Sequence, residues 1–280
     1  MHFTHQNTVL EWSRDGSPRA TKALLLHGLS GISTSYDEVV EQLGVDADVF
    51  RLDLRGHGRS DHAAGTYTVP FYTADVVAFI EQVIAEPVVL VGHSLGGVIA
   101  HHITATRPDL VRSALCEDPP LYFCDQALFE QSVFATIFPI LEAAMRSAQS
   151  AGQPREYFVA MVADAVMPWG RAGDNMSERA LQSRVDAMML ADPDVWGPAI
   201  HGGALSGYDP DAHIARPMII LQADPQMGPA LFPDHAARQH VANPDVEIRL
   251  VEGAPHGIHS FLRSSERYVE ALGEIIKRAS

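Results

Sequence analysis

One stretch of the sequence constrains the fold more than any other: residues 88–102, which read VVLVGHSLGGVIAHH. A run of β-branched and aliphatic residues ends at Gly92, and a helical pattern of apolar residues begins directly after Ser94. A strand that passes straight into a helix forces the serine into a sharp turn, and only small residues beside it leave room for the two elements. The stretch therefore predicts a strand, a tight turn that exposes the Ser94 hydroxyl, and a helix. The alternative is a serine that only caps the helix.

Short apolar runs alternate with longer amphipathic segments along most of the chain, a pattern typical of a mostly parallel sheet with crossover helices. The runs are too short and too apolar for half-exposed strands, so we expect them to be buried on both faces. The expected strands are Lys22–Leu26, Val49–Leu52, Val88–Val91, Ser113–Cys116, Met218–Leu221 and Val246–Val251. An antiparallel edge pair is expected at Phe3–Gln6 and Thr8–Trp12. The expected helices are Ser35–Leu43, Pro70–Ala85, Ser94–Thr106 and Ile258–Arg278.

The strand pattern is interrupted once, from about Tyr122 to His213, where the segments have helical spacing and are rich in Phe, Met and Ile. The strand pattern resumes at Arg216, so the interruption indicates an insertion and not a separate domain. We therefore expect an α/β core formed by residues 1–121 and 214–280, with a helical subdomain, residues 122–213, inserted over the sheet.

The charge of the chain argues against two classes of partner. With 20 Lys+Arg against 35 Asp+Glu, the formal net charge of −15 repels both a phosphate backbone and an anionic membrane. We therefore expect neither nucleic acid nor a membrane as a partner. Two cysteines are too few for a disulfide framework, and neither they nor the 14 histidines suggest a metal site, so no metal or cofactor is expected. The first residues lack the basic and apolar segments of a secretion signal, which favours a cytoplasmic location.

A serine hydroxyl becomes a good nucleophile only when a base removes its proton, so a histidine must lie beside Ser94. The segment VEGAPHGIHSF follows the last expected strand and contains His256 and His259. His256 is the preferred base, because His259 lies at the start of the final helix and is expected at the rim of the pocket or as a capping residue. Two backbone N–H groups must stabilise the oxyanion, and we expect them from Leu95, directly after the serine, and from Leu29 in the segment LLLHGLSG.

Four motifs in this chain order resemble the α/β-hydrolase family: HGLSG, DLRGHGRS, VGHSLGG and a late PHG. The resemblance covers essentially the whole chain. It implies an α/β-hydrolase fold, a Ser-His-Asp triad and a helical cap, formed by the insert, that shapes the acyl pocket. Asp53, Arg55 and His57 match a loop of the family that is usually structural or lines the substrate site, so no catalytic role is carried over to them.

The family can place the triad acid after either of two strands, and this sequence has an aspartate at both positions. Asp118 lies 24 residues beyond Ser94 (118 − 94 = 24), in a segment SALCEDPP that is similar to bacterial zearalenone lactonases. A related enamide hydrolase also uses the acid after this strand. Asp224 lies near the commoner position, but it follows Ala223 directly, whereas the family usually has a glycine a few residues earlier. Asp118 is therefore preferred, and Glu117 is expected on the opposite side of the strand as a hydrogen-bond partner that is buried or at the rim.

These residues predict a hydrolase that cleaves an ester or lactone through an acyl-enzyme on Ser94. The aromatic and Met-rich insert favours an apolar or aromatic substrate, for which a macrolactone like zearalenone is one candidate. The expected substrate contacts are Gly28, Ser30, Trp196 and His259, with Trp169 as a second candidate indole donor. The alternatives are cleavage of a C–C or amide (enamide) bond by the same triad, and a non-catalytic ligand receptor on this fold. The apolar face of the insert also allows a homodimer.

Overall fold

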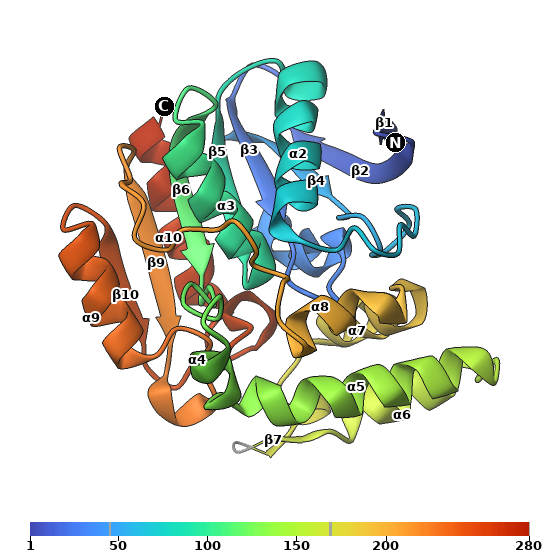
Figure 1. Cartoon of the computed structure of the whole chain (residues 1–280). Helices are drawn as coiled ribbons and strands as arrows, with labels where there is room; N and C mark the ends of the chain where they lie inside the picture. Colours follow the sequence, from blue (N-terminus) through green and yellow to red (C-terminus); the bar gives the residue numbers. More distant parts are fainter. Residues whose placement is uncertain (45, 168–169, 280) are drawn as a thin grey trace.

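The computed structural model describes residues 1–44, 46–167 and 170–279. Its central sheet contains, in chain order, β1 His2–His5, β2 Thr8–Gly16, β3 Thr21–Leu26, β4 Ala47–Leu52, β5 Val88–His93, β6 Val111–Glu117, β9 Met218–Ala223 and β10 Glu247–Val251. In space the order is β1-β2-β4-β3-β5-β6-β9-β10 (Figure 1). All pairs from β4 to β10 are parallel, whereas β1 and β2 are antiparallel at one edge. The predicted α/β architecture with an antiparallel N-terminal edge is confirmed.

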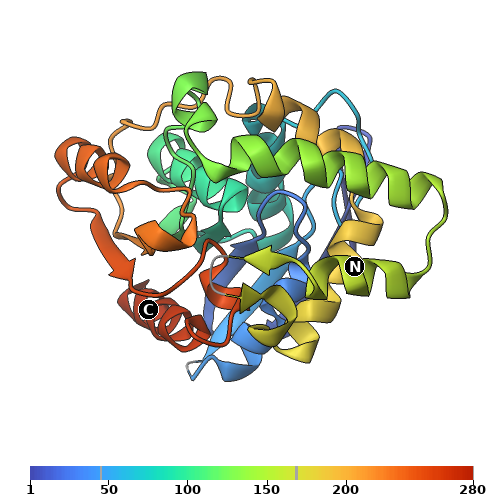
Figure 2. The same cartoon turned by 90° about the horizontal axis from the view of Figure 1, so that it is seen from below.

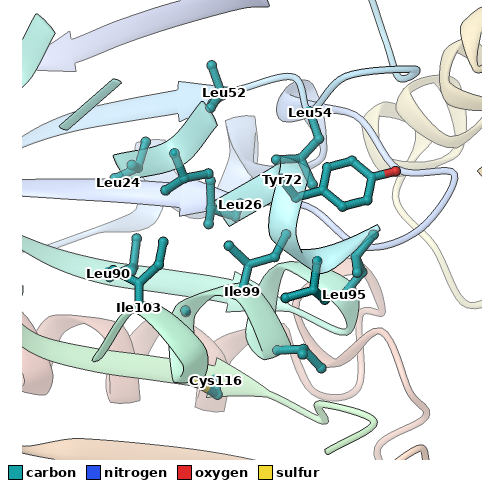
Figure 3. Packing of buried hydrophobic residues seen from close by; sticks show 14 of the residues in the cluster. Leu24, Leu26, Leu52, Leu54, Tyr72, Leu90, Leu95, Ile99, Ile103 and Cys116 are labelled. Carbon is teal, nitrogen blue, oxygen red and sulfur yellow. The ribbon is translucent and has the colours of Figure 1, made fainter. Parts of the chain in front are cut away.

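Helices cover both faces of this sheet, and they are α1 Asp37–Gln42, α2 Val69–Phe79, α3 Leu95–Thr106, α9 Pro233–Ala242 and α10 Ser265–Ala279. One hydrophobic cluster joins α2 and α3 to strand residues such as Leu24, Leu26 and Leu90 (Figure 3). A second cluster joins α1 and α10 to the alternate strand residues Leu25 and Val91. Because successive side chains of a strand point to opposite faces, β3 and β5 are buried on both sides, as their apolar sequences predicted.

The expectation of burial on both faces is wrong for the last strand. β10 is the outer strand of the sheet, and Leu250 is 50% exposed. This strand has a neighbouring strand, β9, on one side, and most of its side chains are only partly buried.

The insert is mainly helical and lies at the end of the sheet toward which the arrows of β6 and β9 point (Figures 1 and 2). Its helices are α4 Gln126–Glu130, α5 Val133–Ser150, α6 Arg155–Ala163, α7 Glu178–Leu190 and α8 Trp196–Ile200. A short antiparallel ribbon, β7 Val166–Met167 and β8 Gly170–Arg171, was not predicted. Its two-residue strands are too short to produce a periodic pattern in the sequence.

The C-terminal helix begins later than the sequence predicted. Residues Ile258–Ser260 form a separate 3₁₀ turn, and α10 starts at Ser265. Phe261, between them, is extended and bridges to Met176 of the insert. This contact between distant parts of the chain replaces the first turn of the expected helix. Within the described ranges, no helix combines the length and the apolar character that crossing a bilayer requires.

Candidate active site

Ser94 occupies the sharp turn between β5 and α3, as the sequence predicted. Its φ of 52° lies in the left-handed region, and its backbone N–H donates to Glu117 O at 2.9 Å. A Cβ at Gly92 would lie 2.1 Å from Gly96 O, and a Cβ at Gly96 would lie 2.3 Å from Leu26 O. Both glycines are therefore required by the close approach of β5, α3 and the neighbouring strand β3. The strained turn holds the serine at the carboxyl end of the sheet.

Asp118 contacts His256, and Asp224 does not. Asp118 directly follows β6 and is fully buried, with its Oδ2 2.7 Å from His256 Nδ1. The same carboxylate accepts backbone N–H bonds from Ala230 at 2.7 Å and from Ala223 and Leu231 at 3.2 Å each. With four donors around two oxygens, the carboxylate is held in a fixed orientation.

Asp224 instead stabilises the loop in which it lies. Its Oδ1 accepts from Gln226 N at 2.9 Å, and its Oδ2 accepts from Gly253 N at 2.7 Å. These backbone hydrogen bonds, that from Gly253 first, lower the pKa of Asp224 below its usual value. Its two oxygens are thus engaged by the main chain of the turns at the ends of β9 and β10.

Ser94 and His256 line one cavity of about 280 Å³ together with Leu29 and Leu95. Most of the other lining residues are apolar or aromatic, and many come from the insert. They are Tyr67, Tyr72, Pro120, Phe123, Cys124, Phe129, Phe134, Phe138, Val195, Pro198, Ala199, Gly202, Gly203, Ala204, Leu205, Ser206 and Ala230. Among the described residues, this lining contains no Asp, Glu, Lys or Arg.

Four residues expected to contact substrate lie outside this lining. Gly28 packs against the turn, where an added Cβ would lie 2.7 Å from the ring of His93. Ser30 is fully buried and has a φ of 51°, and its backbone oxygen accepts a hydrogen bond from Arg184 at 2.9 Å. These two residues shape the loop that presents Leu29 and do not themselves reach the cavity.

Trp196 and His259 are also absent from the cavity lining. Trp196 is 1% exposed and packs on Phe138, with 4.8 Å between ring centroids, so it supports the cavity wall from behind. His259 is bound by Glu117, which accepts from the His259 backbone N–H at 2.8 Å and lies 2.7 Å from its Nδ1. Glu117 is the buried hydrogen-bond partner that the sequence predicted. Trp169 lies outside the described residues.

The buried His27 and the half-buried His93 lie near the site without lining its cavity. His27 Nε2 accepts from Leu54 N at 3.0 Å, so its Nδ1 carries the proton and donates to Gly28 O at 2.8 Å. Burial lowers the pKa of His27 to about 4, which keeps this ring neutral. Burial and, next, the charge of His256 lower the pKa of His93 well below its usual value. Of these histidines and His256, only His256 lines the cavity.

The sequence profile of the "Alpha/beta hydrolase family" matches residues 23–271, which is most of the chain. This chain belongs to that family. The alpha/beta hydrolase fold inferred from the four motifs is therefore shown, and the motifs lie on the elements that bring Ser94 and His256 to one cavity.

Curated relatives of this alpha/beta hydrolase include lipases. It is 33% identical over 110 residues to lipase LipV of Mycobacterium tuberculosis, covering 39% of this chain and 41% of that protein. It is 33% identical over 120 residues to the sn-1-specific diacylglycerol lipase ABHD11 of Xenopus laevis, covering 41% of this chain and 38% of that protein. The chain thus matches about two fifths of the length of these relatives.

Solved structures share the fold over nearly the whole chain at low identity. An enol-lactonase from Burkholderia xenovorans has a TM-score of 0.73 and 16% identity, covering 99% of this chain and 100% of the other. E-2-(acetamidomethylene)succinate hydrolase has a TM-score of 0.70 and 20% identity, again covering 99% and 100%. A carboxylesterase structure from Nitrososphaera gargenis has a TM-score of 0.76 and 16% identity, covering 100% of both chains.

Two residues near the cavity of this alpha/beta hydrolase were missed by the sequence analysis. Tyr72 of α2 lines the cavity, and Arg184 of α7 ties the insert to the loop after β3 through Ser30. Neither belongs to a motif, and their positions depend on how the insert and α2 meet. Among the described residues, no three His, Cys, Asp or Glu side chains are placed to hold a metal ion.

Proposed function

We propose that this alpha/beta hydrolase is a serine hydrolase that cleaves a carboxylic ester or lactone of an apolar or aromatic substrate. The observation that carries the proposal is the Asp118–His256 contact at 2.7 Å, together with the presence of Ser94 and His256 in the lining of one mostly apolar cavity. A buried carboxylate that accepts from Nδ1 fixes the imidazole tautomer and leaves Nε2 free to take a proton. The lipase relatives support ester bonds as the substrate class.

In the proposed reaction, Ser94 Oγ attacks the carbonyl carbon while its proton passes to His256 Nε2. The backbone N–H groups of Leu29 and Leu95 donate to the carbonyl oxygen as it becomes an oxyanion. The C–O bond to the alcohol then breaks, and the leaving alkoxide takes the proton from His256. A water molecule, deprotonated by the same imidazole, attacks the acyl-enzyme and releases the acid and free Ser94.

The mostly apolar cavity lining, which has no Asp, Glu, Lys or Arg among the described residues, supports a neutral ester or lactone over an anionic substrate. A carboxylate on the substrate would lose its hydration in this cavity and would find no Arg or Lys among the described lining residues. The aromatic residues of the insert provide contact area for an acyl chain or an aromatic ring. A resorcylic macrolactone is one substrate of this type, and aryl esters are another.

A substrate panel tests the proposal. The wild-type chain and Ser94→Ala are assayed on p-nitrophenyl esters, a resorcylic macrolactone, an enamide and a vinylogous diketone. We expect turnover of esters or lactones by the wild type and none above background by Ser94→Ala. Turnover confined to the enamide or the diketone would refute the ester and lactone assignment. Tight binding of the panel without turnover would indicate a receptor instead.

A further inference from the structure

Glu117, the last residue of β6, contacts both the Ser94 turn and the loop that carries His256, although it does not line the cavity. It is fully buried, and its backbone oxygen accepts from Ser94 N at 2.9 Å. Its side-chain Oε1 accepts from His259 N at 2.8 Å. The ring nitrogen Nδ1 of His259 lies 2.7 Å from Oε2 and 2.9 Å from Oε1. One residue thus binds the serine turn and a position just after His256 in the chain.

Close packing does not fix the backbone around His256. Among the described residues, an added Cβ at Gly253 would have no atom within 4 Å, and one at Gly257 would meet its nearest neighbour at 3.6 Å. His93 Nε2 contacts the His256 backbone oxygen at 3.2 Å, which is a single contact. Glycines in open space keep a wide choice of backbone conformations, so hydrogen bonds to the loop must restrict that choice.

Other hydrogen bonds to this loop are local or partly open to water. Ser264 Oγ donates to Ile258 O at 2.7 Å, but both residues belong to the same short segment. Asp224 accepts from Gly253 N at 2.7 Å, but both residues are partly exposed, so water can replace that bond. The contacts of the Glu117 side chain are buried and join the loop to the central sheet. Solvent cannot replace them when they are lost.

The imidazole of His259 is held so that its Nδ1 faces Glu117. It is 7% exposed and stacks on Tyr36, with 4.7 Å between ring centroids. The Tyr36 hydroxyl in turn donates to Leu26 O at 3.0 Å. The other ring nitrogen of His259, Nε2, has no hydrogen-bond partner among the described residues. The polar contacts of the His259 ring therefore run through Nδ1 to Glu117.

We propose that Glu117 is a positioning residue, which holds the His256 loop against the Ser94 turn through His259. This inference rests on the proposed hydrolase function, because it concerns how the imidazole is aimed at the serine. Reacting groups that are held in register react faster, and a misplacement of about 1 Å can lower the rate about a hundredfold. Loss of the Glu117 contacts should therefore lower kcat, whereas KM should change little because the cavity lining is unaltered.

The test compares Glu117→Leu, which removes the acceptor, with Glu117→Gln, whose amide oxygen can still accept from His259 N. On a p-nitrophenyl ester, Glu117→Leu should lower kcat about ten- to a hundredfold at nearly constant KM, and Glu117→Gln should recover most of this loss. His101→Phe is the control, because this buried histidine contacts Tyr208 and Gln239 and not the loop. It should lower stability but keep kcat within about threefold.

Urea unfolding establishes that each variant is folded. If Glu117→Leu does not fold, His259→Phe takes its place, since it removes the Nδ1 contact and keeps a ring to stack on Tyr36. An unchanged kcat in the folded variant would overturn the positioning role. A loss expressed in KM alone, or an equal loss of kcat in His101→Phe, would overturn it as well.

A proton NMR measurement separates this inference from the proposed function, because it needs no substrate. The proton in the 2.7 Å contact between His256 Nδ1 and Asp118 should resonate at low field in the wild type. We expect this signal to be lost or broadened in folded Glu117→Leu and kept in His101→Phe. Equal signals in the two variants would overturn the positioning role. If the wild type hydrolyses none of the esters, the proposed function fails, and the signal still decides whether Glu117 holds His256.

Discussion

Replacing Asp118 with Asn tests which carboxylate serves His256. The change keeps the volume of the side chain but converts one of two hydrogen-bond-accepting oxygens into a donor. All four neighbours of the carboxylate donate, at 2.7 Å on Oδ2 from His256 and Ala230 and at 3.2 Å on Oδ1 from Ala223 and Leu231. Either orientation of the amide therefore turns its NH₂ group against two donors.

This geometry sets how far Asp118→Asn should lower the free energy of unfolding and kcat. Two buried donors without an acceptor cost about 1–3 kcal/mol each, so Asp118→Asn should lower the free energy of unfolding by about 2–6 kcal/mol. The side chain also loses the negative charge that stabilises the His256 imidazolium, or it selects the wrong tautomer. Either consequence lowers kcat by about three to four orders of magnitude.

The assay is kcat on a p-nitrophenyl ester, with urea unfolding to establish that each variant is folded. Asp224→Asn is the control, since it removes one acceptor from a surface turn and not from the imidazole. It should keep kcat within about threefold of wild type. A folded Asp118→Asn that keeps more than about a tenth of the wild-type kcat would refute the reasoning. An equal loss in Asp224→Asn would also refute it.

Three further predictions concern stability and the loop after β3. The free energy of unfolding should fall as the pH drops below 6.5, by up to about 1.4 kcal/mol per pH unit for each buried histidine. The reason is that burial lowers the pKa of His27 to about 4 and that of His57 to about 3, so the unfolded chain takes up protons at a higher pH than the folded chain does. Urea unfolding at pH 7.5 and 5.0 measures this change, and stability that rises toward pH 5 would contradict the prediction. Gly96→Ala should destabilise or misfold the chain because its Cβ would lie 2.3 Å from a main-chain oxygen of β3, whereas Gly197→Ala, with nothing within 4 Å, should be tolerated in the same thermal unfolding scan. Arg184→Ala should lower kcat about tenfold with little change in KM, because the loop that presents the Leu29 N–H loses its tie to α7; an unchanged kcat would count against that tie.

The elements around Ser94 could be predicted because local rules determine them. The glycines of the turn, the apolar runs of the strands and the position of His256 after the last strand are all visible in short segments. Asp118 could be proposed because β6 neighbours β5, so residues at the ends of both strands meet. The relative positions of Ser94 and Asp118 therefore follow from the pairing of the adjacent strands β5 and β6.

The remaining features depend on contacts between segments that are distant in the sequence. Tyr72 resembles the other apolar residues of its helix in the sequence, and only the folded structure shows that it belongs to the cavity lining. Trp196 was expected in the cavity, but packing against Phe138 turns it into the wall behind. His259 was expected at the rim, but the buried carboxylate of Glu117 holds it away from the cavity. The periodicity of the sequence does not show which of these side chains line the cavity and which pack away from it.

The central claim is that His256 and Asp118 activate Ser94. The most direct measurement is labelling with a fluorophosphonate, which phosphonylates an activated serine and loses fluoride, followed by mass spectrometry of the peptides. We predict one adduct, on Ser94, with labelling strongly slowed in folded His256→Ala and Asp118→Asn. An adduct on another residue, no adduct at all, or equal labelling rates in those variants would contradict the account.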